Sequence, residues 1–249
     1  MPSADSSTED TLDLRLPTEV LALFAATPQY GDSASAPGLP ERPAGCSGVH
    51  GGPACPSRPA DLLDRVAGWP AAETSAGSFR LVPVRLERDL ALVTGWMNDP
   101  AVARFWELAG DPGVTEGHLR PQLSGDGRSV PCLGVLDGTP MSYWEVYRAD
   151  LDPIARHHPI RPHDTGVHLL IGDAADRARG LGSVLLRAVS TMVLDNRPAC
   201  ARVVAEPDLR NTPSVAAFLS AGFRLGAEVD LPGKRAALMV RDRALRHLL

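Results

Sequence analysis

A turn rich in glycine and arginine lies between a short apolar run and a long amphipathic one. The apolar run, 167–171, is bounded by glycines and predicts a buried strand. After the turn, apolar residues recur at helical spacing over 181–196. A helix that begins directly after such a turn presents free backbone N–H groups and the positive end of its dipole, which suits a phosphate. The residues that would contact the phosphate are Arg177, Arg179, Gly180 and Gly182.

Two other phosphate-binding loops do not fit this turn. A Walker loop would continue with Gly-Lys-Ser or Gly-Lys-Thr, which does not follow here. A dinucleotide-binding turn would need three glycines at a fixed spacing and an acidic residue after the next strand, and neither is in register. The remaining alternative is an ordinary strand-to-helix turn with arginines on its surface.

The composition predicts a globular protein without a nucleic-acid or membrane partner. Apolar residues make up 44% of the 249 residues, and the net charge of −5 argues against a basic nucleic-acid-binding face. The four cysteines form no C-x-x-C pair and are typical of reduced thiols. The acidic N-terminus lacks the features of a signal peptide, and no run approaches the roughly 20 apolar residues of a membrane span. We therefore expect a soluble, cytoplasmic protein.

Residues 1–76 differ in composition from the rest of the chain. They are dense in Pro, Gly, Ser and Ala, with too little apolar surface to offset the entropy of ordering. We predict a largely disordered N-terminal extension with helical patterns only at Leu12–Ala26 and Asp61–Gly68, followed by a folded domain over 77–249. The two cysteines and His50 of the extension match no zinc spacing, nor do the histidines that precede the central strand. No metal site is expected.

Strand and helix patterns alternate within residues 77–249. Strands are predicted at 79–86, 130–136, 141–147, 167–171, 202–206, 222–231 and 236–240. Helices are predicted at 87–97, 101–108, 114–123, 181–196 and 213–221. Tight turns are predicted at 137–138 and 232–233. This order predicts an α/β (α+β) fold, in which a mixed central sheet is flanked by helices.

Five motifs in order resemble those of one enzyme family. Arg177-x-x-Gly180-x-Gly182 after a strand resembles the acyl-CoA pyrophosphate loop of GNAT acyltransferases, whose element order resembles that of residues 79–242. Within that superfamily, the siderophore-type acyltransferases are similar in four further places. These are Trp96-Met97-Asn98-Asp99-Pro100 with Phe105-Trp106, Tyr143-Trp144-Glu145-Val146-Tyr147, Asp164-x-Gly166-x-His168-x-x-x-Gly172, and Glu206-Pro207-Asp208-x-x-Asn211.

The resemblance implies a GNAT-like fold and an acyl-CoA-dependent N-acyltransferase of hydroxamate siderophore biosynthesis, which acylates N-hydroxylysine, lysine or a related diamine. It implies acetyl-CoA or another acyl-CoA as cosubstrate. His168 would be the general base or would orient the substrate, and Asp208 would lie opposite it as the second catalytic group. The residues that would bind the cofactor are Leu169, Leu170, Ile171, Arg177, Arg179, Gly180, Leu181, Gly182, Asn211 and Phe218. The residues that would line the acceptor pocket are Trp106, Trp144, Glu145 and Tyr147.

These implied roles agree with the chemistry of acyl transfer. The reaction needs a neutral nucleophile, a hydrogen-bond donor to the thioester oxygen, and a path for one proton. A histidine titrates near neutral pH, and a neighbouring carboxylate can fix its tautomer. A hydroxylamine is already neutral at pH 7, so positioning would matter more than a base.

Each assignment has a structural alternative. His168 could be a satisfied core histidine, and Asp208 could cap the helix predicted to begin near Pro213. Glu145 could bind a substrate ammonium or simply face solvent. The aromatic side chains that could equally pack in the core are Trp106, Trp144 and Tyr147.

One position departs from the family pattern. Where many GNAT enzymes have a tyrosine that protonates the leaving thiolate, this chain has Phe218. Asp208 or water would then serve the thiolate, or it would leave unassisted. Two rival functions remain: an aminoglycoside or other small-amine acetyltransferase, for which an acidic pocket is expected, and a non-catalytic acyl-CoA-binding domain. In the latter, the extension would dock a partner such as a siderophore synthetase.

Overall fold

A computed structural model describes residues 63–125 and 127–247 of the chain. Its strands are β1 (Ala72–Thr74), β2 (Gly77–Pro83), β3 (Ser129–Leu136), β4 (Thr139–Arg148), β5 (Thr165–Ile171), β6 (Arg202–Ala205), β7 (Arg224–Leu231) and β8 (Lys234–Asp242). Its α-helices are α2 (Leu86–Met97), α3 (Pro100–Trp106), α4 (Pro112–Leu123), α5 (Leu181–Asn196) and α6 (Thr212–Ser220). Its 3-10 helices are η1 (Leu63–Gly68), η2 (Ala149–Leu151), η3 (Pro153–Arg156), η4 (Ala174–Asp176) and η5 (Arg243–Leu245). The predicted strands and helices of the domain are confirmed, with ends shifted by a few residues. The helix predicted at Leu12–Ala26 lies outside the described residues.

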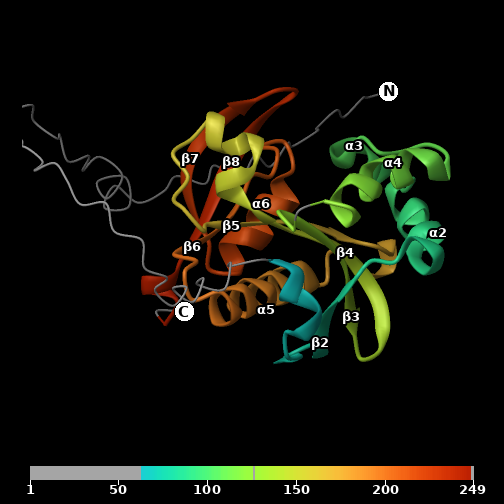
Figure 1. Cartoon of the computed structure of the whole chain (residues 1–249), viewed down its shortest axis with the longest axis horizontal. Coiled ribbons are helices and arrows are strands. Elements are labelled where there is room, and N and C mark those ends of the chain that lie inside the picture. Colours follow the sequence, from blue (N-terminus) through green and yellow to red (C-terminus); the bar gives the residue numbers. More distant parts are fainter. Residues whose placement is uncertain (1–62, 126, 248–249) are drawn as a thin grey trace, which may run out of the picture. The chain divides into compact units, whose positions relative to one another are not determined.

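The eight strands form one mixed sheet in the order β1-β2-β3-β4-β5-β6-β8-β7 (Figure 1). Every neighbouring pair is antiparallel except β5 and β6, which are parallel. The parallel pair is joined through α5, as a parallel connection requires a crossover. This mixed sheet with helices on its faces confirms the predicted fold class.

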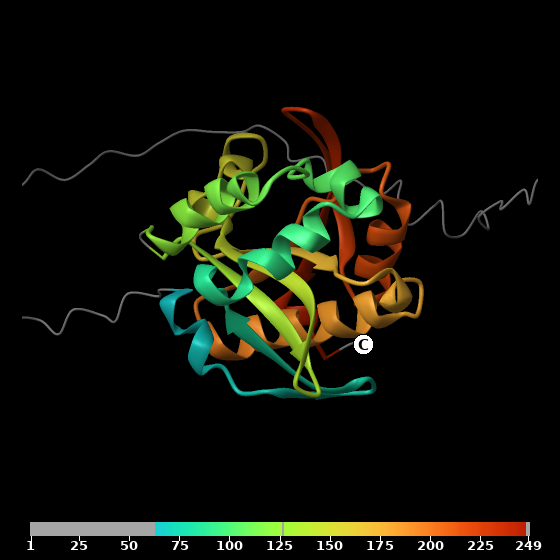
Figure 2. The same cartoon turned by 90° about the vertical axis from the view of Figure 1, so that its right-hand side faces the viewer.

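Helices cover both faces of the sheet, and each face has its own core. On one face, α5 and α6 pack with η1 against side chains that include Phe79 and Trp144. On the other face, α2, α3 and α4 pack around Val93, Met97 and Tyr143. Figure 2 shows α2 crossing in front of the sheet and α5 behind it. Among the helices described here, none is both long enough and apolar enough to cross a membrane.

Residues upstream of the predicted domain start at residue 77 also pack against the sheet. Leu63 and Val66 of η1 are fully buried in the core beneath α5. β1 then adds an antiparallel edge strand to β2, with Ala72 paired to Phe79. The average composition of residues 1–76 predicts disorder, but Leu63 and Val66 are apolar and become buried. Their burial stabilises this local segment against the domain.

The two parallel strands diverge soon after they begin. β5 and β6 pair only at Thr165 with Val203 and at Gly166 with Val204. Residues 167–171 remain paired to β4 on one side, and among the described strands they have no partner on the other. This divergence opens the sheet at its centre and leaves one backbone edge of β5 free for a ligand.

Candidate active site

A pocket of about 250 Å³ lies where β5 and β6 diverge. Side chains from α3, α4, β4, β5 and α6 and from the start of β8 line it, together with the segment that follows β6. Its titratable residues are His118, Glu145, His168, Glu206, Asp208 and Lys234. The two residues predicted to be catalytic, His168 and Asp208, therefore line the same pocket.

His168 lies between two carboxylates. It is the cross-strand partner of Glu145 in the β4–β5 register, so the two side chains lie on the same face of the sheet. Its Nδ1 is 2.9 Å from Glu145 Oε2, and its Nε2 is 2.5 Å from Oε1 of Glu206, which directly follows β6. The His168 side chain is 32% exposed, whereas the carboxylate side chains are 8% and 7% exposed. The imidazole thus has access to the pocket while its partners are buried.

The carboxylate of Glu145 is saturated with hydrogen bonds. Its Oε1 accepts from Tyr143 Oη at 2.8 Å and Gln122 Nε2 at 2.9 Å, and lies 2.5 Å from His118 Nε2. His118 and Gln122 are one turn apart on α4, so they reach the carboxylate from one helical face. With Oε2 on His168, this buried glutamate positions the histidine and does not face solvent.

Glu206 is held from the other side by Tyr147. The Tyr147 hydroxyl donates to Glu206 Oε2 at 2.6 Å, and its ring lies 4.7 Å from the His168 ring between centroids. Tyr147 pairs with Gly166 across β4 and β5, and a Cβ atom at Gly166 would lie 2.0 Å from the tyrosine ring. Glycine at this position therefore lets the ring lie over β5 and bring its hydroxyl to Glu206.

These contacts keep His168 protonated. Desolvation on its own would lower the pKa of His168, but the charges and hydrogen bonds of Glu206 and Glu145 outweigh it and raise that pKa to about 10. Desolvation would raise the pKa of Glu206, but the His168 charge outweighs it and lowers that pKa to about 2. The pKa of Glu145 is likewise held well below its ordinary value, against desolvation, by His118 and His168. An imidazolium donates both N–H groups, one to each carboxylate.

Asp208 lines the pocket, but its carboxylate is bound by Arg210. Its Oδ1 accepts from the backbone N–H of Arg210 at 2.7 Å, and the Arg210 guanidinium binds its Oδ2 at 2.6 Å. The acidic group on His168 Nε2 is Glu206, two residues earlier. The helix-capping alternative is wrong, because the N-cap of α6 is Asn211, whose side chain accepts from the Ser214 N–H. A catalytic role for Asp208 stays a prediction.

The predicted pocket aromatics have different environments. Trp106 lines the pocket, with its ring edge-on to His168 at 6.1 Å between centroids. Trp144 is fully buried on the opposite face, in the core beneath α5, and its indole N–H donates to Ser142 Oγ. Its position fits the core-packing alternative. Phe218 lines the pocket and packs edge-on against Phe223 at 5.0 Å.

The two arginines of the predicted phosphate turn have different partners and different exposure. Arg177 donates from Nε to the Ile171 backbone oxygen at 3.0 Å, binds the Gly172 oxygen, and pairs with Asp99 at 2.9 Å. It therefore ties the end of β5 to the start of α3. Arg179 is 64% exposed, and its ion-pair partner within the described residues is Asp176, at 3.2 Å.

The backbone at this turn suits an anion. Ala178 and Gly180 both have left-handed φ angles, 56° and 78°. Gly180 is followed at once by Leu181 and Gly182, the first two residues of α5, so the free N–H groups of the helix start here. Upstream, Leu169 lines the pocket, whereas Leu170 and Ile171 pack in the cores on the two faces. Leu170 and Ile171 can therefore meet a ligand mainly through their backbone.

Three titratable residues of the pocket are absent from the site that the sequence predicts. Glu206 lies in the motif Glu206-Pro207-Asp208-x-x-Asn211, of which the resemblance assigns a catalytic role to Asp208. His118 and Lys234 belong to no motif, and their distance from His168 along the chain conceals their place in the pocket. The signal available was the helical spacing of His118 and Gln122 on α4.

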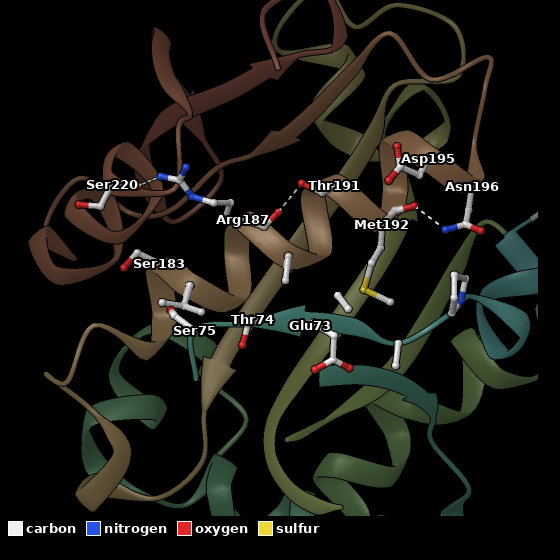
Figure 3. A pocket seen from close by; sticks show the side chains of 15 residues that line it. Glu73, Thr74, Ser75, Ser183, Arg187, Thr191, Met192, Asp195, Asn196 and Ser220 are labelled. Atoms are coloured by element: carbon white, nitrogen blue, oxygen red, sulfur yellow. Dashed lines mark hydrogen bonds between the residues drawn. The ribbon is translucent and has the colours of Figure 1, made fainter. Parts of the chain in front are cut away.

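A second pocket, of about 560 Å³, lies between α5 and the β1 segment (Figure 3). Its polar side chains mostly bond to nearby backbone: Arg187 donates to the Ser220 oxygen, Thr191 to the Arg187 oxygen, and Asn196 to the Met192 oxygen. It lacks the acid–imidazole array of the smaller pocket. We therefore take the pocket at His168 as the candidate active site.

Comparison with known proteins agrees with this geometry. The model of the acetyltransferase (GNAT) domain family matches residues 85–231, and the chain belongs to this family of acyltransferases. It is 33% identical to lysine N-acyltransferase MbtK of Mycobacterium sp. (strain MCS) over 77% of this chain and 79% of that one. It is 37% identical to N(6)-hydroxylysine O-acetyltransferase of Escherichia coli over 67% of this chain and 52% of that one, about half its length. Among solved structures, aminoglycoside acetyltransferase AAC(6')-Ib in complex with coenzyme A matches with a TM-score of 0.61 and 25% identity, over 68% of this chain and 96% of that one.

Proposed function

We propose that this acyltransferase transfers an acyl group from acyl-CoA, most simply acetyl-CoA, to N6-hydroxylysine, lysine or a related hydroxylated diamine in hydroxamate siderophore assembly. The observation that carries the proposal is the Glu145–His168–Glu206 array in a pocket at the divergence of β5 and β6. The names of the two relatives supply the acceptor class. A cytoplasmic location and a siderophore synthetase as partner stay predictions.

The donor fits the free edge of β5 and the start of α5. Backbone groups of residues 167–171 would pair with the pantetheine arm, and the turn before α5 would hold the pyrophosphate. Arg179 is the arginine available for a phosphate, because Arg177 is already bound to backbone oxygens and Asp99. When bound, the acyl-CoA supplies the thioester, whose C–S bond breaks as the C–N bond to the acceptor forms.

Arg179→Ala is expected to raise the KM for acetyl-CoA about 5- to 20-fold, since one charge-assisted hydrogen bond at an exposed site is worth roughly 1–2 kcal/mol. The thermal midpoint should stay within about 2 °C of the wild type, because the side chain is exposed. Arg177→Ala is the matched comparison, and it should lower the midpoint because three contacts are lost. Steady-state kinetics and thermal melts measure both. An unchanged KM in Arg179→Ala would remove this residue from the donor site.

The protonation of His168 sets its role. A histidine whose pKa is about 10 cannot accept a proton near pH 7, so we assign it as proton donor and orienting group. The acceptor hydroxylamine is neutral and needs no base to expose its lone pair. The imidazolium can give a proton to the departing sulfur, a role that Phe218 cannot fill, and the proton lost by the acceptor restores it through Glu206 or water.

The aminoglycoside alternative has less support from the pocket. A polycationic acceptor needs carboxylates that are free to bind its ammonium groups. Of the acidic side chains that line the pocket, Glu145 and Glu206 are bound to His168, and Asp208 is bound to Arg210. Each carboxylate therefore already has a positively charged partner within the chain.

A thiol-release assay tests the proposal. Purified full-length protein is given acetyl-CoA with N6-hydroxylysine, lysine, N-hydroxycadaverine or kanamycin, and the acylated product is identified by mass spectrometry, including whether nitrogen or oxygen carries the acyl group. We expect turnover of the lysine-derived acceptors and little of kanamycin. Preference for kanamycin would support the aminoglycoside alternative. Binding of acetyl-CoA without turnover of any acceptor would favour a non-catalytic acyl-CoA-binding domain.

A further inference from the structure

The candidate active site contains the chain's only lysine. Lys234 is the single lysine among 249 residues, and every other residue in the basic total of 25 is an arginine. It is the first residue of β8, directly after the turn at 232–233, and its half-buried side chain lines the pocket. Its Nζ donates to the backbone oxygen of Glu206 at 2.7 Å.

Lys234 differs from the other charged groups of the pocket. The carboxylates of Glu145 and Glu206 hold the imidazolium of His168 between them, and Asp208 is bound by the guanidinium two residues later. The one hydrogen-bond partner of the Lys234 ammonium within the described residues is a neutral carbonyl. An ammonium group has three donors, so two remain for a ligand or water. The Lys234 charge helps to lower the pKa of Glu206 and of Asp208, but its hydrogen bond goes to a backbone oxygen and not to either carboxylate, so the ammonium can still bind an incoming anion.

We propose that Lys234 binds the carboxylate of an amino-acid acceptor and thereby selects amino acids over the corresponding decarboxylated diamines. The proposal rests on the proposed function and names the residue that recognises the non-reacting end of the acceptor. An amino acid brings its own carboxylate into the pocket, where the cations of His168 and Arg210 are already paired with Glu145, Glu206 and Asp208. Burial of this further carboxylate is unfavourable unless another cation meets it. The hydroxylamine end would then face His168, while the carboxylate end binds Lys234.

The test compares two acceptors that differ by this carboxylate. For each protein, kcat/KM is measured with N6-hydroxylysine and with N-hydroxycadaverine, and the ratio of the two values is the readout. Because both values come from the same sample, the ratio does not depend on the folded fraction. Lys234→Met, which keeps the length of the side chain, should lower the ratio about 10- to 100-fold, the size expected for a lost hydrogen bond between charged groups. Lys234→Arg should recover part of it.

Arg235→Met is the matched control. Its side chain is 65% exposed, pairs with Glu228 on the neighbouring strand, and does not line the pocket, so its ratio should equal that of the wild type. A ratio that stays unchanged in Lys234→Met would overturn the proposal, even if both rates fall. If the wild type turns over neither hydroxylamine but does acetylate kanamycin, the proposed function itself fails, which is a different result from an unchanged ratio.

Discussion

Glu206→Gln is expected to lower kcat/KM for the hydroxylamine acceptor by about 100- to 1000-fold, which lies within the roughly 100- to 10,000-fold that general acid–base catalysis contributes. Glu206 accepts from both His168 Nε2 and the Tyr147 hydroxyl, and its charge helps to hold the pKa of His168 at about 10. A glutamine keeps the size of the side chain but removes the charge and places an amide donor near the ring. Steady-state kinetics with saturating acetyl-CoA measure the effect.

Asp208→Asn is the matched control for this variant. It makes the same change of carboxylate to amide, in the same pocket and only two residues away. Because the Asp208 carboxylate is bound by Arg210 and not by His168, we expect a loss of less than about 5-fold, as for an ion pair with one exposed partner. The opposite order of effects would restore Asp208 as the second catalytic group.

His168→Gln is expected to lower kcat about 100- to 10,000-fold, because it removes the proposed proton donor. It also leaves the buried carboxylates of Glu145 and Glu206 without their shared cation, so the thermal midpoint should fall. Rates must therefore be corrected for the folded fraction. His118→Gln is the comparison variant. The native His118 side chain contacts Glu145 and not Glu206, so its replacement should lower kcat less than that of His168.

The pH dependence of His168 tests its protonation directly. Its pKa in the folded protein, about 10, lies above the ordinary value of 6.5, so the ring should stay charged at neutral pH and lose its proton only as the pH rises through about 10. The stability that this charge contributes is full below pH 6.5 and is lost in the same alkaline range. Ring carbon–proton NMR spectra, assigned by the signal missing in His168→Gln, should show no titration between roughly pH 6 and 8.5. Titration near 6.5 would return His168 to the role of general base.

The local patterns of the sequence determined the order of elements and the family. The periodicity of apolar residues extends over whole strands and helices, so it can be recognised without knowledge of tertiary contacts. The five motifs lie in short segments, so their spacing can be read directly from the sequence. Gly166 and His168 are an example. The Tyr147 ring packs over Gly166 and lies beside the His168 ring, which explains the spacing of these two residues. The turn before α5 was predicted for the same reason.

Only the tertiary structure decided which side chains meet. β6 ends at Ala205, but Asp208 still bridges Ala236 of β8 in the register of the strand. Glu206 and Asp208 are two residues apart, so the alternation of side chains predicts the same face for both, and the sequence could not choose between them. The packing of α4 over the sheet brings His118 to Glu145, 27 residues along the chain, and the β7–β8 turn brings Lys234 to Glu206, 28 residues away. Such contacts depend on strand register and helix packing, which local propensity does not encode.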